Sequence, residues 1–223
     1  MTYAAPASID GPAVESVVLI VEDDPSIRNA LRRLFTTMGQ RVLTFGSASE
    51  LLESELPDVP SCLVLDIRLP GRSGLDLQAE LGKAGAPIPI IFMTGHGDIS
   101  MSVRAMKAGA LDFLTKPFRD QDMLDAVEAA IGRDRARRAD AQALDLLRSR
   151  FDALNAREKD VMRLATSGLM NKQIAWEIGL TEMTVKMHRG NVMRKMSARS
   201  IADLVRMADG LDLRHADSPT MRP

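Results

Sequence analysis

The sequence predicts an α/β domain with a parallel sheet, followed by a smaller domain made only of helices. Short β-branched runs alternate with helical segments over residues 17–131, and the pattern is helical from about Asp120 onward. The charge balance also changes along the chain: residues 1–131 hold 11 Lys and Arg against 18 Asp and Glu, whereas residues 151–223 hold 12 against 9. Two domains with different partners are therefore expected.

The composition supports this division and excludes several classes of protein. A chain of 223 residues with 45% hydrophobic and 26% charged residues has room for two globular cores and is neither collagen-like nor low in complexity. The single cysteine, Cys62, excludes an internal disulfide and is expected as a small core residue. The apolar run Val17–Val21 is far too short to span a membrane, and no signal-peptide pattern opens the chain. We expect a cytoplasmic protein without membrane contact.

The α/β domain, residues 17–131, is expected to contain five strands. They are predicted at Val17–Val21, Arg41–Phe45, Cys62–Leu65, Ile90–Met93 and Leu111–Leu114. Asp24 is a candidate N-cap for a helix that Pro25 opens and that runs to Gly39. Further helices are expected at Ser47–Ser54, Leu75–Gly82 and Ser100–Ala108. Strands that alternate with helices predict a parallel sheet covered on both faces.

The remaining chain is expected to form a helical linker (132–150) and a four-helix domain (151–213), with flexible tails at 1–16 and 214–223. The arginine run Arg133–Arg138 is typical of a solvated helix face, with nucleic-acid binding as the alternative. In the four-helix domain, Asn155 and Glu158 form a capping-box pattern before the first helix. The other helices are predicted at Asn171–Ile178, from Thr181, and at Ser200–Gly210. The tight turn Gly179–Thr181 between two short helices indicates a helix-turn-helix motif.

Polar residues follow four of the five predicted strands. Glu22 and Asp23 follow the first, Asp66 the third, Thr94 the fourth and Lys116 the fifth. Because ligands of open parallel sheets bind at the carboxyl ends of the strands, these side chains are expected in one pocket. Clustered carboxylates favour Mg²⁺, with Asp66 as a nucleophile towards phosphorus and with Lys116 and Thr94 binding the transferred group. A single acidic pair is usually a helix cap and a lone Lys-Pro a turn, but five matching positions are hard to explain in that way.

Residues 17–131 resemble the receiver domain of two-component response regulators. The matching motifs are VVLIVEDD (17–24), LDIRLPGRSG (65–74), MTGHGD (93–98) and FLTKPF (113–118). The resemblance implies the doubly wound strand order 2-1-3-4-5 and phosphorylation of Asp66. It implies Mg²⁺ held by Glu22 (through water), Asp23, Asp66 and the backbone carbonyl of Arg68, and a cis bond between Lys116 and Pro117. Glu22 stands where the family often has aspartate.

The resemblance also implies a switch. Thr94 would bind the phosphoryl oxygen while the aromatic residue on the last strand, Phe113, turns inward. Phe113 lacks the hydroxyl of the tyrosine that often serves here, and by itself it is equally well explained as a core residue.

The third helix of the C-terminal domain has one apolar side and one polar, basic side. Val185, Val192 and Met196 are expected in the core, which leaves Lys186 on a face that suits the major groove. An ordinary amphipathic surface helix would show the same pattern. Residues 154–200, however, resemble the LuxR-type helix-turn-helix of the FixJ/NarL family, FixJ-like branch. The resemblance implies a recognition helix at about Glu182–Lys195. The residues expected to contact DNA are Thr184, Lys186, Met187, His188, Arg189, Asn191, Arg194 and Lys195.

Three nearby residues carry separate expectations. Met170 stands where the family usually has a capping Ser or Thr, so Asn171 could cap that helix or its end could fray. His188 is a near-core position for which a metal role is not expected. Trp176 is expected to pack within its helix rather than to stack on bases.

We interpret the chain as a phosphorylation-activated transcription factor rather than an enzyme with an external substrate. A sensor histidine kinase would phosphorylate Asp66 with Mg²⁺ as cofactor, and the receiver would catalyse only its own phosphorylation and dephosphorylation. Phosphorylation would drive homodimerisation through the Ser100–Leu114 face and binding to promoter DNA, with RNA polymerase as a further partner. The alternatives are a phosphotransfer enzyme, for which no substrate pocket or acid–base residue is apparent, and a regulator that works without phosphorylation.

Overall fold

The computed structural model describes residues 16–95 and 99–213, and the chain divides into two compact units after Arg138. The tails predicted at 1–16 and 214–223 lie outside the described residues, apart from Ser16. The predicted helical linker, 132–150, is part of α5 (Asp120–Asp152), one helix of 33 residues that contributes side chains to both units.

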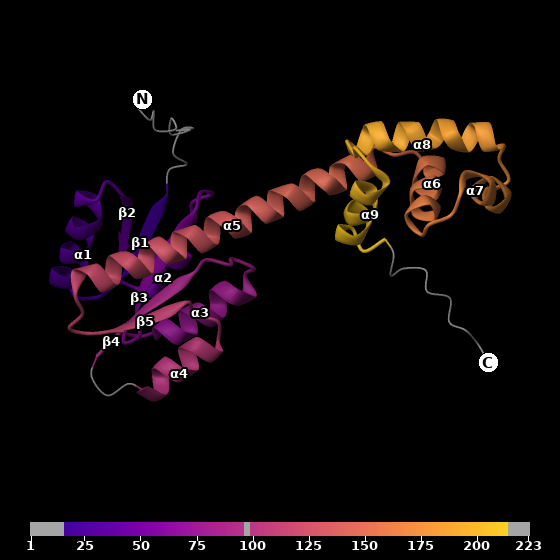
Figure 1. The fold of residues 1–223 in the computed structure, drawn as a ribbon. Helices are drawn as coiled ribbons and strands as arrows, with labels where there is room; N and C mark the ends of the chain where they lie inside the picture. Colours follow the sequence, from indigo (N-terminus) through magenta and orange to yellow (C-terminus); the bar gives the residue numbers. More distant parts are fainter. Residues whose placement is uncertain (1–15, 96–98, 214–223) are drawn as a thin grey trace, which may run out of the picture. The chain divides into compact units, whose positions relative to one another are not determined.

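A five-stranded parallel sheet forms the first unit, in the predicted order β2-β1-β3-β4-β5 (Figure 1). The strands are β1 (Val17–Val21), β2 (Arg41–Phe45), β3 (Ser61–Asp66), β4 (Ile90–Thr94) and β5 (Asp112–Thr115). The central strand β1 pairs with both neighbours, so that Val17 lies opposite Arg41 and Ser61. Every residue of β1, β3 and β4 is buried, which explains why these strands are mainly apolar, with polar residues only at their ends.

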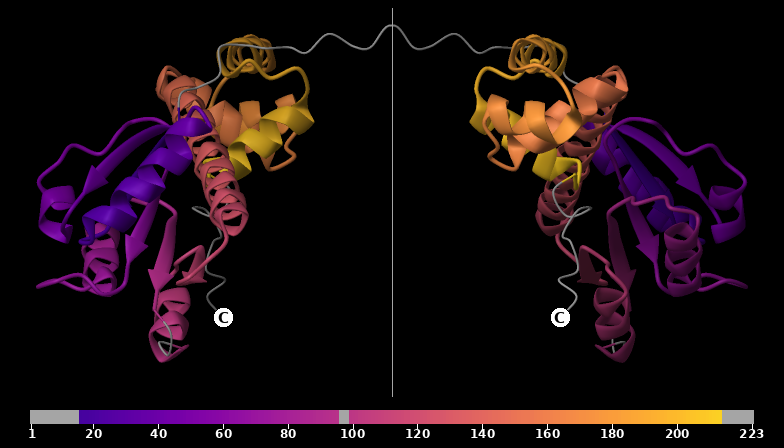
Figure 2. Two further views of the ribbon diagram at one scale, coloured as in Figure 1. Left: turned by 90° about the vertical axis from the view of Figure 1, so that its left-hand side faces the viewer. Right: turned by 90° about the vertical axis from the view of Figure 1, so that its right-hand side faces the viewer.

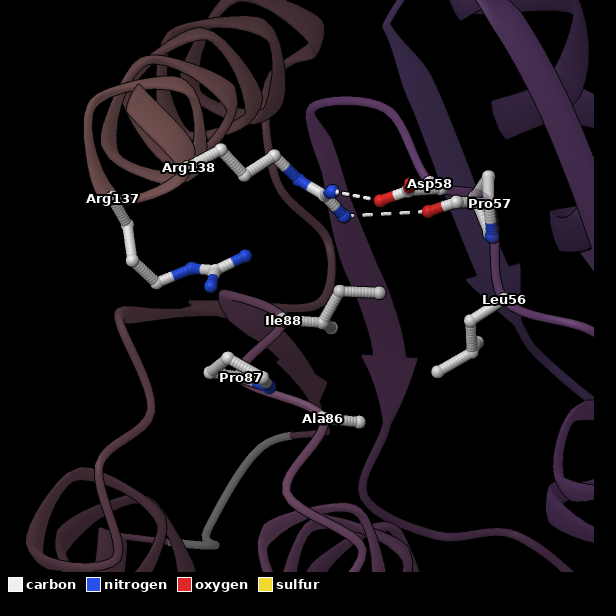
Figure 3. Close-up of a pocket in the computed structure, with 8 residues that line it drawn as sticks. All are labelled: Leu56, Pro57, Asp58, Ala86, Pro87, Ile88, Arg137 and Arg138. Carbon is white, nitrogen blue, oxygen red and sulfur yellow. Dashed lines mark hydrogen bonds and ion pairs between the residues drawn. The ribbon is translucent and has the colours of Figure 1, made fainter. Parts of the chain in front are cut away.

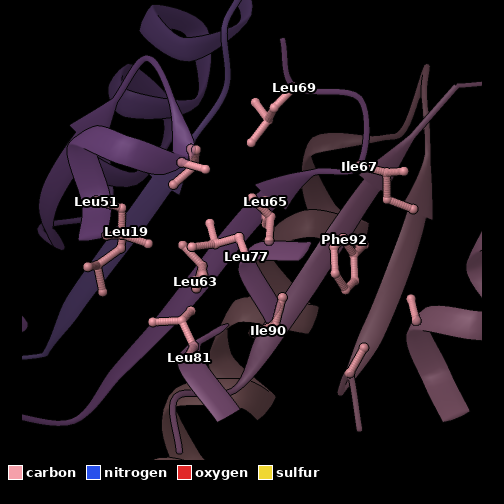
Figure 4. Close-up of a cluster of buried hydrophobic side chains, with 14 of the residues drawn as sticks. Leu19, Leu51, Leu63, Leu65, Ile67, Leu69, Leu77, Leu81, Ile90 and Phe92 are labelled. Carbon is pink, nitrogen blue, oxygen red and sulfur yellow. The ribbon is translucent and has the colours of Figure 1, made fainter. Parts of the chain in front are cut away.

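Helices cover both faces of this sheet, as Figures 1 and 2 show. On one face, residues such as Leu19, Leu63 and Phe92 form a core with α2 (Ala48–Leu52), α3 (Gly74–Lys83) and α4 (Ile99–Lys107) (Figure 4). On the other face, the alternate residues of the strands pack against α1 (Pro25–Thr37) and the first half of α5. Cys62 lies in this second core, fully buried as predicted, and burial raises the pKa of its thiol to about 12.

The arginine run on α5 is not simply a solvated face. The fully buried Asp134 carboxylate accepts the Ser61 amide at 3.0 Å and pairs with Arg137 and Arg138 at 2.7 and 2.8 Å. Arg138 also donates to Asp58 and to the Pro57 carbonyl (Figure 3). These bonds fasten α5 to the start of β3, so the α/β unit continues to Arg138, beyond the predicted boundary at 131.

The second unit packs the helices α6 (Ala156–Thr166), α7 (Asn171–Ile178), α8 (Glu182–Met196) and α9 (Ile201–Gly210). Asn155 and Glu158 form the predicted capping box of α6, and Thr181 and Ser200 cap α8 and α9. Gly179 ends α7 with φ +67°, a left-handed conformation that glycine adopts without strain. This turn lets α7 and α8 pack together around Ile174 and Val185.

Candidate functional site

The carboxyl ends of the strands bring the predicted acidic residues together. Glu22 and Asp23 follow β1, and Asp66 is the last residue of β3. One carboxylate oxygen from each of these three residues lies within 4.8 Å of the other two. Carboxylate oxygens are hard ligands at a spacing that one divalent cation can bridge, so this cluster fits Mg²⁺.

Lys116 lies directly against this cluster. It follows β5, and its Nζ donates to Glu22 Oε2 at 2.7 Å and to Asp66 Oδ2 at 2.6 Å. The Lys116–Pro117 peptide bond is cis, as the resemblance implied. The Lys116 amide also donates to the Thr94 carbonyl at 2.7 Å, which anchors the segment to the end of β4.

Burial and charge act together on these groups. Glu22 is only 1% exposed, and burial raises the pKa of its carboxyl, an effect to which the negative charge of Asp66 adds and which Lys116 opposes. Burial lowers the pKa of Lys116, but its hydrogen bonds with Asp66 and Glu22 outweigh burial and raise that pKa overall. One ammonium group therefore pairs with two carboxylates, and the cluster has an excess of negative charge when Asp23 is included.

The main chain around Asp66 is closely packed. Asp66 Oδ1 accepts the Arg68 amide at 2.9 Å, while Oδ2 accepts from Lys116. Gly74 begins α3 directly against this strand end: a Cβ at Gly74 would lie 2.4 Å from the Asp66 carbonyl oxygen. The sequence motif places a glycine here because only a residue without a side chain allows this approach.

Thr94 and Phe113, the predicted switch pair, differ in burial. Thr94 is buried at the end of β4, and its hydroxyl donates to the Gly95 carbonyl at 3.3 Å. Phe113 is 38% exposed on β5, so its interpretation as a plain core residue is wrong. Its switching role stays a prediction. Residues 96–98 of the MTGHGD motif lie outside the described residues.

One residue near the acidic cluster was not singled out from the sequence. Arg28 on α1 donates from Nη1 to the backbone carbonyls of Glu22 and Asp23, at 2.6 and 3.1 Å. A basic residue one turn into the helix that follows an acidic pair is the signal that would have found it. Asp24, by contrast, is the helix cap that the sequence predicts, since its Oδ1 accepts the Ser26 amide.

The recognition helix α8 has the predicted two-sided character. Val185, Val192 and Met196 are buried, while Lys186, Met187 and Arg194 are exposed and Thr184 and Asn191 are half-buried. The exposed side carries basic, polar and apolar groups that can reach the base edges of a major groove.

Two basic residues of α8 are held inside the unit. Lys195 Nζ lies 2.6 Å from Glu158 Oε2 and donates to the Ala153 carbonyl at 3.2 Å. Glu158 is buried, so Lys195 contributes to the stability of the unit, and its predicted phosphate contact stays a prediction. Arg189 donates to Asn171 Oδ1 at 2.9 Å, which joins α8 to the start of α7.

The predictions for α7 need correction. Met170 is the N-cap residue, and its amide donates to Gln173 Oε1 at 2.8 Å, so Asn171 does not cap the helix. Trp176 is 85% exposed and does not pack within the helix as expected, because α7 turns Ile174 and Ala175 towards the core. His188 is half-buried, and within the described residues it is not part of any group that could hold a metal.

A second candidate site lies at the opposite end of the sheet from the acidic cluster. A hollow of about 190 Å³ lies there, lined by Leu56, Ile88, Arg137 and Arg138 among others (Figure 3). Its arginines are engaged by Asp134 and Asp58. The acidic cluster therefore remains the better candidate for chemistry in this unit. Among the described helices, none is long and apolar enough to cross a membrane.

Two family models match the chain, one for each unit. Residues 18–128 match the response regulator receiver domain, and residues 152–208 match the LuxR family of bacterial regulatory proteins. Both matches agree with the motifs found in the sequence.

Individual relatives match nearly the whole chain. Nodulation protein W of Bradyrhizobium diazoefficiens is 58% identical over 90% of this chain and 88% of its own length. Transcriptional regulatory protein FixJ of Rhizobium meliloti is 42% identical over 86% and 94%. A solved structure of response regulator StyR is 48% identical, with a TM-score of 0.81 over 87% of this chain and 98% of that one. The chain thus belongs to the response regulators that join a receiver domain to a LuxR-type DNA-binding domain, in the branch that includes FixJ.

Proposed function

We propose that Asp66 accepts a phosphoryl group and that this modification controls DNA binding by the C-terminal domain. The observation that carries the proposal is the contact of Lys116 with both Asp66 and Glu22, next to the exposed carboxylate of Asp23. This arrangement brings together a carboxylate that could act as a nucleophile, an ammonium group and a set of hard oxygen ligands.

The residues present fit a bound Mg²⁺. Asp23, Asp66 and the Arg68 backbone carbonyl would hold it, with Glu22 contributing through water. When bound, the ion neutralises negative charge on the phosphoryl group. Lys116, which donates to Asp66 Oδ2, would provide positive charge, and the Thr94 hydroxyl at the end of β4 would bind a phosphoryl oxygen.

The proposed phosphodonor is a phosphohistidine of a sensor kinase, the partner that a receiver domain implies. The phosphorus–nitrogen bond of the donor breaks, and a phosphorus–oxygen bond to Asp66 forms. The receiver catalyses this transfer and the later hydrolysis on itself and on no other substrate. A cytoplasmic location fits such a donor and a chromosomal DNA target.

Phosphorylation adds a charge of about −1.5 to −2 at the strand ends and is proposed to change the α4–β5 face. Val103 and Met106 on α4 and Phe113 on β5 are exposed large apolar side chains on that face. A surface of this kind supports homodimerisation through Ser100–Leu114. The dimer would present two recognition helices to two half-sites and contact RNA polymerase at the promoter.

Within the DNA-binding domain, Lys186 and Met187 are proposed to read base edges, together with Thr184 and Asn191. Arg189 and Arg194 are proposed to contact phosphates, with His188 supporting the helix from its half-buried position.

A small-molecule phosphodonor with Mg²⁺ tests the proposal. The parent chain should gain one hydroxylamine-labile phosphoryl group, detected by mass, and Asp66→Asn should gain none. Sedimentation should show monomer becoming dimer, and DNA affinity should rise, on phosphorylation of the parent only. Labelling of Asp66→Asn to the parental level would refute the assignment, and equal DNA binding with and without phosphodonor would indicate a constitutive regulator.

A further inference from the structure

Arg28 contacts the main chain of the two acidic residues that follow β1. Its Nη1 donates to the carbonyl oxygen of Glu22 at 2.6 Å and to that of Asp23 at 3.1 Å. Glu22 and Asp23 both lie beyond the last residue of β1, in the segment that leads into α1. A single guanidinium nitrogen therefore fixes two consecutive peptide groups in the segment that supplies two of the three clustered carboxylates.

The need for such a support differs between the two acidic residues. Glu22 is buried, and its carboxylate is held by Lys116 at 2.7 Å and by the Asp24 amide at 3.3 Å. Asp23 is exposed, and its position depends on the conformation of its main chain. Arg28 is the side chain that bonds to the Asp23 carbonyl.

The Glu50 carboxylate lies near Arg28, on its own side of the loop. A Cβ placed on Gly46 would lie 3.6 Å from Arg28 Nη1 and 3.4 Å from Glu50 Oε1, so the guanidinium and the Glu50 carboxylate border the same point. Glu50 is itself held there, because its Oε2 accepts the Gly46 amide at 2.7 Å. The guanidinium thus donates to two carbonyl oxygens and has a carboxylate in its neighbourhood, and both reduce its repulsion of a cation at the acidic cluster.

We propose that Arg28 is a positioning residue for the divalent-cation site, acting through the Glu22 and Asp23 carbonyls. The inference rests on the proposed function, since it concerns the site where Mg²⁺ would bind. Loss of Arg28 has two opposing effects: it frees the loop, which weakens cation binding, and it removes a positive charge, which strengthens binding. Residues that orient metal ligands typically change affinity by about 10- to 100-fold. Because Arg28 bonds directly to two consecutive carbonyls of the loop and its charge lies near Glu50, we expect the positioning effect to be larger.

Calorimetric titration of the full chain with MgCl₂ measures the effect directly, without phosphorylation. Arg28→Ala should raise the Mg²⁺ dissociation constant about tenfold. Arg28→Lys retains the charge but has a shorter, non-planar donor, so an intermediate value is expected. Arg32→Ala is the matched control, because Arg32 is exposed one turn further along the same helix and should leave the constant unchanged.

Phosphorylation by acetyl phosphate at increasing MgCl₂ separates positioning from damage to the fold. In Arg28→Ala the half-saturating Mg²⁺ concentration should rise by the same factor, and the rate at saturating Mg²⁺ should return to within about twofold of the parent. A purely structural role would lower the saturating rate and leave the half-saturating concentration in place, which would overturn the proposal.

The remaining outcomes are also decisive. Mg²⁺ binding by Arg28→Ala as tight as, or tighter than, that of the parent overturns the positioning role. If circular dichroism shows that Arg28→Ala is unfolded, Arg28→Lys takes its place: a raised dissociation constant supports the role and a parental one overturns it. A parent chain that neither binds Mg²⁺ nor becomes phosphorylated refutes the proposed function itself, whatever the variants do.

Discussion

Each domain of the molecule contains a lysine bonded to a buried glutamate, yet the pKa values of the two glutamates are shifted in opposite directions. In the receiver, Lys116 Nζ lies 2.7 Å from Glu22, and burial raises the pKa of Glu22 overall. In the DNA-binding domain, Lys195 Nζ lies 2.6 Å from Glu158. Burial raises the pKa of Glu158 too, but hydrogen bonds from Lys195 and from the Asn155 amide outweigh it, and the pKa is lowered.

Burial is the largest influence on the pKa of Glu22, and the number of carboxylates bonded to each lysine adds to the difference. Lys195 faces one carboxylate, whose other hydrogen bond comes from the helix start that it caps. Lys116 is shared by Glu22 and Asp66, and these two carboxylates repel each other. A matched buried pair makes the fold depend on both partners, because removal of one leaves an uncompensated charge, whereas a cluster with excess negative charge is destabilised until it gains positive charge. The contrast fits the proposal that the receiver cluster is the reactive one.

Breaking the matched pair should give the largest effect. Lys195→Ala leaves Glu158 buried without its ammonium partner, and we expect a loss of about 3 kcal/mol in unfolding free energy, near the low end for buried pairs because Lys195 is 30% exposed. Urea unfolding of the domain measures it. Lys186→Ala, on the same helix but exposed, should change stability by less than about 0.5 kcal/mol. Equal losses in the two variants would contradict the structural role of Lys195.

DNA binding should also distinguish the two lysines, because only Lys186 is proposed to contact a base edge. Lys186→Ala should cost roughly 1–3 kcal/mol at a specific site and relax the preference at one base pair. Titrations on specific and random duplexes at several salt concentrations would show this. If both duplexes lose affinity equally, Lys186 contacts phosphate rather than a base edge.

Replacing Glu22 by a neutral residue should leave the stability of the receiver nearly unchanged or raise it. Glu22→Gln removes a buried charge that faces Asp66, and we expect receiver stability to rise by roughly 1 kcal/mol while Mg²⁺ affinity falls. Glu158→Gln, the corresponding change in the other domain, should destabilise. Thermal unfolding of both variants at neutral pH compares them, and destabilisation of similar size in both would remove the distinction between the two sites.

The smallest expected effect is a difference in pH dependence. Because the pKa of Glu158 is lowered, its stabilising contribution is present above the ordinary value of 4.5 and is lost as the pH falls through the folded-state pKa. Because the pKa of Glu22 is raised, the cost of its ionised form is present at neutral pH and disappears as the pH falls towards 4.5. The stability difference between parent and Glu22→Gln should shrink on acidification before that between parent and Glu158→Gln does. Parallel pH profiles would show that the two glutamates do not differ.

The sequence predicted the elements and the acidic cluster well because both depend on local pattern. Apolar runs locate buried strands to within a residue or so at most ends, and the rule for parallel sheets then brings Glu22, Asp66 and Lys116 to one edge. Capping residues such as Asp24 and Asn155 were equally predictable, since their side chains accept hydrogen bonds from amides three residues away.

The contacts that were missed join residues far apart in the chain. Asp134 meets the Ser61 amide across 73 positions, and Lys195 meets Glu158 across 37, so no local pattern reveals either pair. A similar reason explains why the sequence did not reveal that Trp176 is exposed. An eight-residue helix offers several possible buried faces, and only packing against α8 selects the one with Ile174 and Ala175.

The burial of Cys62 gives the receiver an internal reporter. As the chain's single cysteine, on the strand that ends at Asp66, it is fully buried with a pKa of about 12, so thiol reagents can modify it only when the strand is uncovered. The rate of thiol modification therefore measures how often the receiver core opens. The single tryptophan, Trp176, is an exposed fluorophore in the other domain. Because Trp176 is already exposed in the folded domain, its fluorescence should change little on opening, and thiol modification of Cys62 follows the receiver alone.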